Sequence, residues 1–165
     1  MTETIPTVSA NPATRKTAWG GFTIERTLDA SPARVFAAFA DPAIKKQWFG
    51  VSDEWTPMES SLDFRVGGEE VDHGRHVSGF VSQMWAQYHD IIPNERIVWS
   101  YRMSLNDVPI SASLASIELT PAGTGTRMVF VEQDVFLDDY EDNGSREEGT
   151  NQILDSLVAL LARTA

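Results

Sequence analysis

The chain has 165 residues, of which 42% are hydrophobic, and it carries a formal net charge of −11 at pH 7. This length suits one domain with a substantial core, and the negative charge argues against nucleic acid or an anionic membrane as the main partner. Because the chain has no cysteine, disulfides, thiolate metal sites and cysteine nucleophiles are excluded.

Residues 1–18 are rich in Thr, Pro, Ala and Asn and show no hydrophobic periodicity. Such a segment cannot bury enough apolar area to offset the entropy of ordering, so we expect a flexible tail before a single domain over residues 19–165. The tail lacks the apolar core of a signal peptide, and no stretch approaches the roughly 20 apolar residues of a membrane span. The simplest expectation is a soluble cytoplasmic protein with no membrane span.

A strand and two short helices are expected next. Residues 22–28 alternate apolar and polar side chains as a strand does. Asp29-Ala30-Ser31-Pro32 then supplies a helix N-cap followed by a proline at the first helical position. Asp41-Pro42 should end that helix and begin a second short one, which runs through Trp48.

Short extended pieces are expected between Trp55 and Arg75. The first alternates at residues 62–66 up to a Gly67-Gly68 turn, and the second leads from Glu69 to a turn at His73-Gly74. This pattern indicates an antiparallel meander.

The clearest strand covers residues 96–105, whose odd-numbered positions give one unusually large and aromatic face. The strand after it, residues 110–119, places the small side chains of Ser111, Ser113 and Ala115 on one face. Large residues beside small ones either leave room for a cavity or pack against each other. Residues 126–136 carry apolar side chains on both faces, so periodicity does not fix which face of that strand points inward.

The last element predicted is a helix over residues 145–162. Its apolar stripe consists of Ile153, Leu154, Leu157, Val158, Leu160 and Leu161. Ser145 and Glu148 have capping-box spacing at its start. Gly149 lies in a less apolar first half, so something other than tight packing is expected there. These elements predict an α+β fold in which a curved antiparallel sheet closes over the C-terminal helix.

This order of elements resembles the helix-grip fold of the START-like (SRPBCC) superfamily. More narrowly, residues 22–163 resemble the bacterial branch related to the C-terminal domain of the Hsp90 ATPase activator (AHSA1-like). The residues that carry the resemblance are 24–28, Asp29-Ala30-Ser31-Pro32-Ala33-Arg34-Val35-Phe36, Asp41-Pro42, Trp48-Phe49-Gly50, Asp63-Phe64-Arg65-Val66-Gly67-Gly68, Pro93-Asn94-Glu95-Arg96-Ile97-Val98-Trp99, Gly125-Thr126-Arg127 and Arg146-Glu147-Glu148-Gly149.

The resemblance implies a hydrophobic cavity between the sheet and the C-terminal helix, which different members use to hold lipids, polyketides or other small apolar molecules. It brings no shared catalytic motif and no cofactor. The residues expected to line the cavity are Trp48, Phe49, Trp55, Trp85, Trp99, Tyr101, Met103 and Gly149. The alternative for the bulky members of this set is an ordinary core.

We therefore expect binding of a small hydrophobic or amphipathic molecule. One alternative is an enzyme of the cyclase, hydratase or hydrolase type that uses the same cavity, and another is a chaperone-associated interaction module. Ionisable residues converging in the cavity would favour chemistry, and a contiguous exposed apolar patch would favour the module. The sequence leaves open the ligand, whether a reaction is catalysed, the pathway and a homodimer.

Some polar groups are candidates for other chemistry. Residue types that bind metals gather around one turn, at Glu69, Glu70, Asp72, His73 and His76. Since neighbouring residues of a strand point to opposite faces, a solvated turn is the favoured interpretation and no metal is expected.

Tyr88-His89-Asp90 resembles an acid/base group with an orienting carboxylate, but consecutive strand residues rarely face each other. Glu132 and Asp134 lie two apart and share a strand face. An outward, solvated face is the favoured interpretation for this pair. If the face is inward, both carboxyl groups need hydrogen bonds and become candidate site residues.

Overall fold

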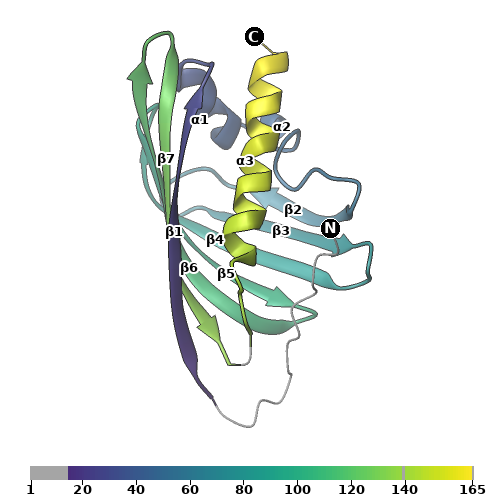
Figure 1. Cartoon of the computed structure of the whole chain (residues 1–165). Coiled ribbons are helices and arrows are strands. Elements are labelled where there is room, and N and C mark those ends of the chain that lie inside the picture. Colours follow the sequence, from purple (N-terminus) through teal and green to yellow (C-terminus); the bar gives the residue numbers. More distant parts are fainter. Residues whose placement is uncertain (1–14, 139, 165) are drawn as a thin grey trace.

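The computed structural model describes residues 15–138 and 140–164, which form a seven-stranded antiparallel sheet and the helices around it (Figure 1). The elements in chain order are β1 (Thr17–Leu28), α1 (Pro32–Ala40), α2 (Pro42–Lys45), β2 (Trp55–Leu62), β3 (Glu69–His76), β4 (Val81–Ile92), β5 (Arg96–Leu105), β6 (Val108–Ala122), β7 (Gly125–Leu137) and α3 (Ser145–Arg163). The α+β helix-grip fold predicted from the sequence is confirmed.

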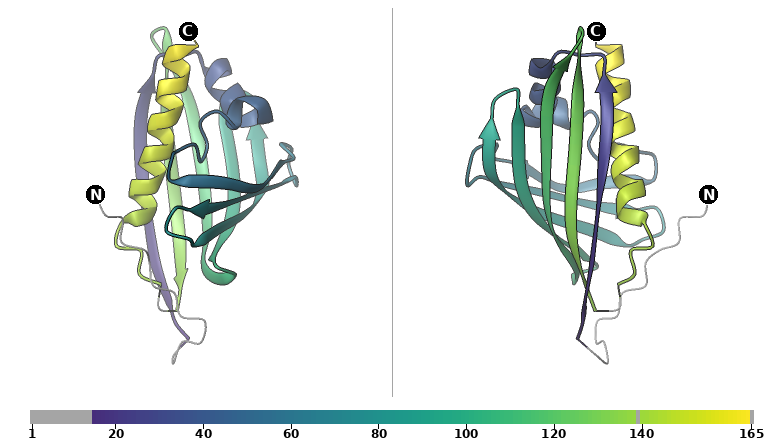
Figure 2. Two further views of the ribbon diagram at one scale, coloured as in Figure 1. Left: turned by 90° about the vertical axis from the view of Figure 1, so that its right-hand side faces the viewer. Right: turned by 60° about the vertical axis from the view of Figure 1, so that its left-hand side comes forward.

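The sheet has the strand order β1-β7-β6-β5-β4-β3-β2, so β2 to β7 form a meander and β1 pairs with β7. The sheet bends around α3, which lies on its concave side (Figure 2). α3 contacts β1 and α1, while α1 also contacts β6 and β7. The two short helices thus close the fold near the C-terminal end of α3 (Figure 1).

Both short helices begin at the side-chain caps that the sequence predicts. Ser31 accepts a hydrogen bond from the amide of Arg34, and Asp41 accepts one from the amide of Ala43. A proline occupies the first helical position of each. The second helix is shorter than expected, since α2 ends at Lys45 and only turns continue beyond it.

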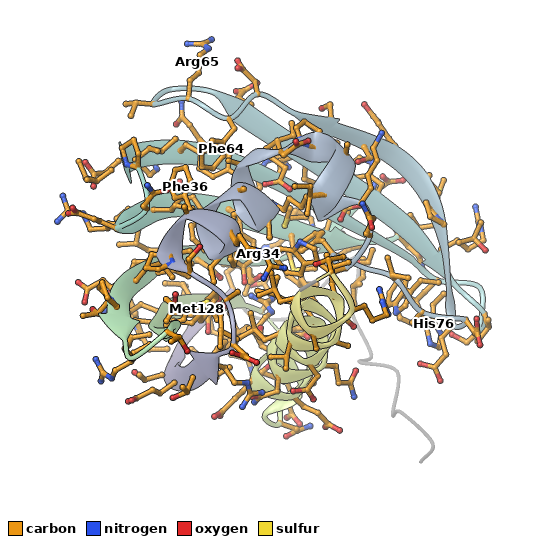
Figure 3. All side chains as sticks on the ribbon, turned by 90° about the horizontal axis from the view of Figure 1, so that it is seen from above. Arg34, Phe36, Phe64, Arg65, His76 and Met128 are labelled. Atoms are coloured by element: carbon orange, nitrogen blue, oxygen red, sulfur yellow. The ribbon has the colours of Figure 1, made fainter. Side chains whose placement is uncertain are left out.

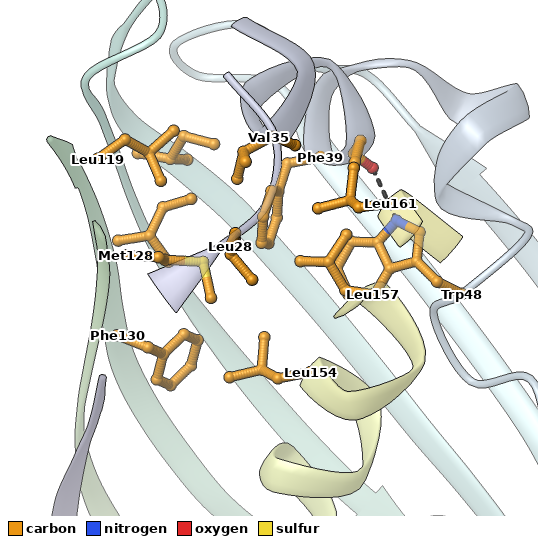
Figure 4. Packing of buried hydrophobic residues seen from close by; sticks show 14 of the residues in the cluster. Leu28, Val35, Phe39, Trp48, Leu119, Met128, Phe130, Leu154, Leu157 and Leu161 are labelled. Atoms are coloured by element: carbon orange, nitrogen blue, oxygen red, sulfur yellow. Dashed lines mark hydrogen bonds between the residues drawn. The ribbon is translucent and has the colours of Figure 1, made fainter. Parts of the chain in front are cut away.

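The main core lies between the C-terminal half of α3, α1 and the adjoining strands. Leu154, Leu157 and Leu161 of α3 pack with Trp48 and Phe130 in one buried cluster (Figure 4). The indole Nε1 of Trp48 donates a 2.9 Å hydrogen bond to the carbonyl of Ala38, so the one polar atom of this side chain is satisfied (Figure 4).

A view from above shows how α1 joins the core to the far end of the sheet. The rings of Phe36 and Phe64 meet edge to face, with centroids 5.6 Å apart (Figure 3). His76 lies far from this contact, at the other end of β3 (Figure 3). Among the described residues, no helix is both long enough and apolar enough to cross a membrane.

The meander expected between residues 55 and 75 is present as β2 and β3, but two of its details differ. Residues 63–66 are not a strand, although the chain turns at Gly67 as expected; Phe64 packs onto Tyr88, while Val66 is exposed. β3 continues through His73-Gly74, and the chain turns at residues 77–79 instead. Gly74 permits a close approach rather than a turn, because a Cβ there would lie 3.3 Å from the ring of Trp55.

Two boundaries also differ. β1 begins at Thr17, within the expected tail, and Thr17 and Ala18 pair with β7. Arg15 forms a 2.8 Å ion pair with Asp138, which follows β7. The rest of the expected tail, residues 1–14, lies outside the described residues. At α3 the N-cap is Gly144, and Asp142 accepts the hydrogen bond from the amide of Arg146, so Ser145 is not the cap of a capping box.

Candidate functional site

Strand register brings residues from five strands into rows across the concave face. One row runs Glu70, Ala86, Tyr101, Ser113, Asp134. The row on one side of it contains Tyr88, Trp99, Ala115 and Glu132, and the row on the other side contains Asp72, Met84, Met103, Ser111 and Phe136. Since neighbouring strands lie about 4.8 Å apart, these side chains share one patch of the inner face.

Trp99, Tyr101 and Met103 form a half-buried stripe along the middle of this patch. Ala86, Ser113 and Ala115 on the neighbouring strands are buried and small, as the sequence predicts for β6. Tyr101 therefore has small neighbours on both adjoining strands, while Trp99 and Met103 have small neighbours on β6.

α3 fills the space above the sheet unevenly. Its buried leucines all lie at or after Leu154, within the second half of the helix. In the first half, a Cβ added to Gly149 would meet no atom within 4 Å, so open space adjoins the helix there. Ile153, the next inward apolar residue, is only half-buried.

Arg146 in the first turn of α3 enters a buried polar group that we call the Arg146 cluster. Its members are Tyr101, Ser111, Ser113, Glu132, Asp134 and Arg146. Arg146 Nη2 donates a 2.7 Å hydrogen bond to Ser111, and Nη1 lies 3.0 Å from Tyr101 Oη, 3.4 Å from Asp134 Oδ1 and 3.5 Å from Glu132 Oε1.

Short hydrogen bonds join the remaining members of the cluster. Tyr101 Oη donates to Glu132 Oε1 at 2.5 Å, and Ser113 Oγ donates to Asp134 Oδ1 at 2.5 Å. Glu132 and Asp134 are 3% and 1% exposed, so their strand face points inward and the expected outward face is wrong. The guanidinium and hydroxyl groups supply the hydrogen bonds that make this burial tolerable.

The environment of the cluster keeps one carboxyl group protonated at neutral pH. Burial, followed by a hydrogen bond with Asp134, raises the pKa of Glu132 to about 8. Burial also raises the pKa of Tyr101, so it remains a neutral phenol. Glu132 can therefore hold or release a proton near pH 8, next to a hydroxyl and a guanidinium group.

A second buried polar group, the Lys45 cluster, lies on the other side of the patch and comprises Lys45, Glu70 and Tyr88. Lys45 Nζ lies 2.6 Å from Glu70 Oε1, and Tyr88 Oη donates a 2.6 Å hydrogen bond to Glu70 Oε2. Asp72 is the next inward residue of β3 and is half-buried. Burial and the nearby charge of Glu70 raise the pKa of Asp72 to about 6.

The structure separates the predicted lining residues. Trp99, Tyr101 and Met103 share the patch, and Phe49 is near it, with its ring centroid 4.8 Å from Lys45 Nζ. Trp48 is core, and Trp55 lies at the β2 edge against His76 and Phe80.

Trp85 lies on the opposite, convex face. It pairs across β4 and β5 with Arg102, whose guanidinium carbon is 3.8 Å from the centroid of the indole ring. Arg102 alternates with Tyr101, so the face that Trp85 occupies is the one that Tyr101 does not. The bulge between Tyr88 and Asp90 comes after Trp85 and does not change this.

The other candidate groups do not converge. Tyr88 joins Lys45 and Glu70, His89 contacts Ser100, and Asp90 pairs with Arg96. Across residues 15–138 and 140–164, no three His, Asp or Glu side chains are placed to hold a metal ion.

The sequence analysis did not identify the two basic residues of the polar clusters, Arg146 and Lys45. Arg146 precedes the apolar stripe of α3 by seven residues, and Lys45 belongs to a helix of four residues, so neither stands out by periodicity. One signal was available: an arginine one turn before Gly149 on the expected inward side of the helix.

Surface hollows occur elsewhere. One of about 350 Å³ is lined by residues 61–63 and by Arg65, Gly67 and Glu69. Another, of about 440 Å³, lies between residues 92–96 and 118–121, beside Pro32. Neither is lined by a member of the concave-face rows.

Comparison with known proteins gives the family. The sequence profile described as "Activator of Hsp90 ATPase homolog 1-like protein" matches residues 29–162. The chain belongs to this family. Its helix-grip fold is one known for ligand binding, and no curated protein matches the chain.

Solved structures extend this result. An uncharacterised protein from Rhizobium leguminosarum is 43% identical with a TM-score of 0.88, over 92% of this chain and 99% of that one. The Mll3558 protein from Rhizobium loti is 46% identical with a TM-score of 0.81, over 88% and 99%. Protein CV1439 from Chromobacterium violaceum is 25% identical with a TM-score of 0.69, over 86% and 96%.

Proposed function

We propose that this protein binds a small hydrophobic or amphipathic molecule on the concave face, between the stripe of Trp99, Tyr101 and Met103 and the first half of α3. The observation that carries the proposal is the open space beside Gly149, next to large apolar side chains that remain half-buried. In the second half of the same helix, leucines occupy the corresponding space.

The lining suits an amphipathic rather than a purely apolar molecule. Binding sites for small molecules are mostly apolar and contain a few polar groups that orient the ligand. Here the apolar stripe lies between the Arg146 cluster and the Lys45 cluster, whose polar atoms are held by short hydrogen bonds. A ligand with an apolar body and a polar group matches both parts of this surface.

A fluorescence titration with N-phenyl-1-naphthylamine, an uncharged probe, tests this proposal. Two matched pairs of variants locate its site: Trp99→Ala against Trp85→Ala, and Gly149→Leu against Glu148→Leu. Trp85 lies on the convex face, and Glu148 is an exposed residue of the same helix turn as Gly149. Trp85→Ala therefore removes the same kind of side chain as Trp99→Ala, but on the convex face. Glu148→Leu introduces the same leucine as Gly149→Leu, but at an exposed position.

We expect saturable binding near one equivalent, weakened about tenfold or more by Trp99→Ala and Gly149→Leu and unchanged by the controls. Thermal melting of each variant shows whether it is folded. No saturable binding to the wild type, or equal loss in a variant and its control, contradicts the proposal.

One observation favours a second function, an enzyme acting at the same patch. Glu132 is buried, and its pKa of about 8 lies near neutrality, as that of a general acid or base should. Tyr101 and Arg146 are positioned to stabilise negative charge that develops on a substrate oxygen. An assay with p-nitrophenyl decanoate tests hydrolysis of an apolar ester, and the loss of any turnover in Glu132→Gln would favour this function over binding alone.

The chaperone-associated module receives less support. Among the described residues, the large exposed apolar side chains are dispersed: Trp19 lies on β1 at one edge of the sheet and Met58 on β2 at the opposite edge. A protein-docking surface requires such residues to form one patch.

A further inference from the structure

We propose that the bound molecule is a cation: an amphiphile with an amine or quaternary ammonium group, held at the carboxyl-rich part of the concave face between Asp72 and Glu132. This inference rests on the proposed function and names the chemical class of the ligand. Its basis is the arrangement of charges on the inner face.

The basic groups of the patch are already neutralised. Lys45 contacts both carboxyl oxygens of Glu70, at 2.6 and 2.8 Å. Arg146 is surrounded by Asp134, Glu132 and hydroxyl groups within 3.5 Å. An anionic ligand would thus meet bases that have carboxylate partners, and it would have to displace those partners to form an ion pair.

The carboxyl groups, in contrast, exceed the bases. Glu70 is paired with Lys45, Glu132 and Asp134 share the single base Arg146, and Asp72 has no base of its own, so four carboxyl groups face two bases. Asp72 makes no hydrogen bond or ion pair within the part of the chain that the structure describes. A half-buried carboxylate of this kind is stabilised by an incoming cation.

Within residues 15–138 and 140–164, the neighbours of Asp72 and Glu132 include no further base. Asp72 adjoins Met84 in its row, Ser60 of β2, and Gly50 in the turn after α2. Glu132 adjoins Ala115 of β6 and Phe22 of β1. Beyond Glu70, Lys45, Tyr101, Asp134 and Arg146, these neighbours are uncharged.

The nearest other ionisable groups have partners outside the patch. Arg26 is paired with Asp155 of α3, and it lies four residues along β1 from Phe22, which is about 13 Å at the rise of a strand. His76 faces Glu54 at 4.0 Å and lies four residues along β3 from Asp72. Neither supplies unbalanced positive charge to the patch.

The aromatic stripe adds attraction for the same charge. Trp99 and Tyr101 are rings of the kind that bind ammonium groups through their faces. The Arg146 guanidinium already lies 5.6 Å from the Tyr101 ring centroid, as a cation does over an aromatic face. An alkyl or aromatic body can lie along Met103 and Ile153, with the ammonium group over the middle of the patch, between Asp72 on β3 and Glu132 on β7.

Cation binding is linked to proton release. The pKa of Asp72 is about 6 and that of Glu132 about 8, and a bound cation lowers both because it favours the ionised forms. The affinity for a cation should therefore rise as the pH rises from 6 to 8.5. The affinity for an anion should fall over the same range.

Isothermal titration with amphiphiles that share a decyl chain tests this assignment: decyltrimethylammonium, decyl maltoside and decyl sulfate, each below its micelle concentration. Salt at about 0.15 M reduces attraction to the net charge of −11. At pH 8.5 we expect the ammonium compound to bind at least tenfold more tightly than the sulfate. At pH 6 the ratio should shrink several-fold.

Charge-removing variants locate the effect. Asp72→Asn and Glu132→Gln should each weaken decyltrimethylammonium binding about three- to tenfold and should affect decyl maltoside binding much less. Asp53→Asn and Glu147→Gln are matched controls, because both residues are exposed and lie away from the patch. In Glu132→Gln the side-chain oxygen can still accept the hydrogen bond from Tyr101, and Asp72 has no hydrogen bond to lose, so both variants should fold.

The possible outcomes separate the cationic assignment from the proposed function. Tighter binding of decyl sulfate, or equal effects of the site and control variants, overturns the cationic assignment but leaves the proposed function standing. Failure of all the decyl compounds and of the uncharged fluorescent probe overturns the proposed function and this inference together.

Discussion

The phenol of Tyr101 on β5 donates a 2.5 Å hydrogen bond to Glu132 on β7, reaching over the intervening strand β6. This bond joins the aromatic stripe to the Arg146 cluster. Because the hydroxyl group of Tyr101 is fixed by this hydrogen bond, its ring is held beside the polar cluster rather than packed into the main core. The same residue therefore belongs to the apolar and to the polar part of the site.

The stability of the protein should depend on pH through Glu132. Its pKa rises from 4.5 to about 8 on folding, so the folded state binds more protons between these values and stability falls as pH rises through them. The slope can reach about 1.4 kcal/mol per pH unit for one group. Urea unfolding between pH 6.5 and 8, above the pKa of Asp72, should show a steeper decline for wild type than for Glu132→Gln. Parallel curves would show that Glu132 does not titrate in this range.

Leu157 should be essential to the core. It is 0% exposed at the centre of the apolar stripe of α3, and Leu157→Ala should cost about 2–5 kcal/mol of unfolding free energy. Val158, next to it, is 38% exposed, so Val158→Ala should cost much less. Denaturant unfolding measures both, and a loss below about 1 kcal/mol for Leu157→Ala would contradict the packing described for α3.

Lys45 and Glu70 should be strongly coupled. Lys45→Met leaves a buried carboxylate without its partner and should cost about 3–5 kcal/mol. In a double-mutant cycle with Glu70→Gln, the double variant should lose less than the sum of the single ones, with a coupling of about 1–3 kcal/mol. The exposed pair of Arg127 and Glu25 is the control and should give a much smaller coupling. Additive effects at Lys45 and Glu70 would show that their contact contributes nothing.

Two N-terminal deletions should differ. Removing residues 1–14 should change the melting temperature by no more than about 1 °C, because their composition offers little to a core. Removing residues 1–18 also eliminates the Arg15–Asp138 ion pair and the pairing of Thr17 and Ala18 with β7. A loss of about 1 kcal/mol, or about 2–4 °C, is expected from the second deletion. Equal melting temperatures would show that residues 15–18 do not stabilise the sheet.

Local patterns were enough to predict much of the fold. The strand at residues 96–105 has the predicted bounds, because its alternation is strict. α3 begins at the predicted residue and ends one residue later, since a broad apolar stripe marks it. A glycine in a strand pattern can mark either a turn or a close approach, so the turn predicted at Gly74 is wrong: this glycine instead allows the ring of Trp55 to approach β3.

The candidate site was less predictable, because its decisive contacts join residues far apart in the chain. β7 has apolar residues on both faces, and only the approach of Arg146 from α3 makes an inward Glu132 and Asp134 tolerable. The hydrophobic periodicity of β7 carries no information about a partner such as Arg146, which lies in a different element. The small residues of β6 and the aromatic face of β5, in contrast, follow directly from alternation.

Indole resonances offer the most direct measurement of the proposed site. In a nitrogen-15 NMR titration with whichever decyl amphiphile binds most tightly, the Trp99 indole N–H should shift and saturate at one equivalent, together with the Gly149 amide. Trp85 on the convex face and Trp19, which is 81% exposed at the sheet edge, should not move. Shifts at Trp85 or Trp19 with Trp99 and Gly149 unmoved would contradict a ligand site on the concave face.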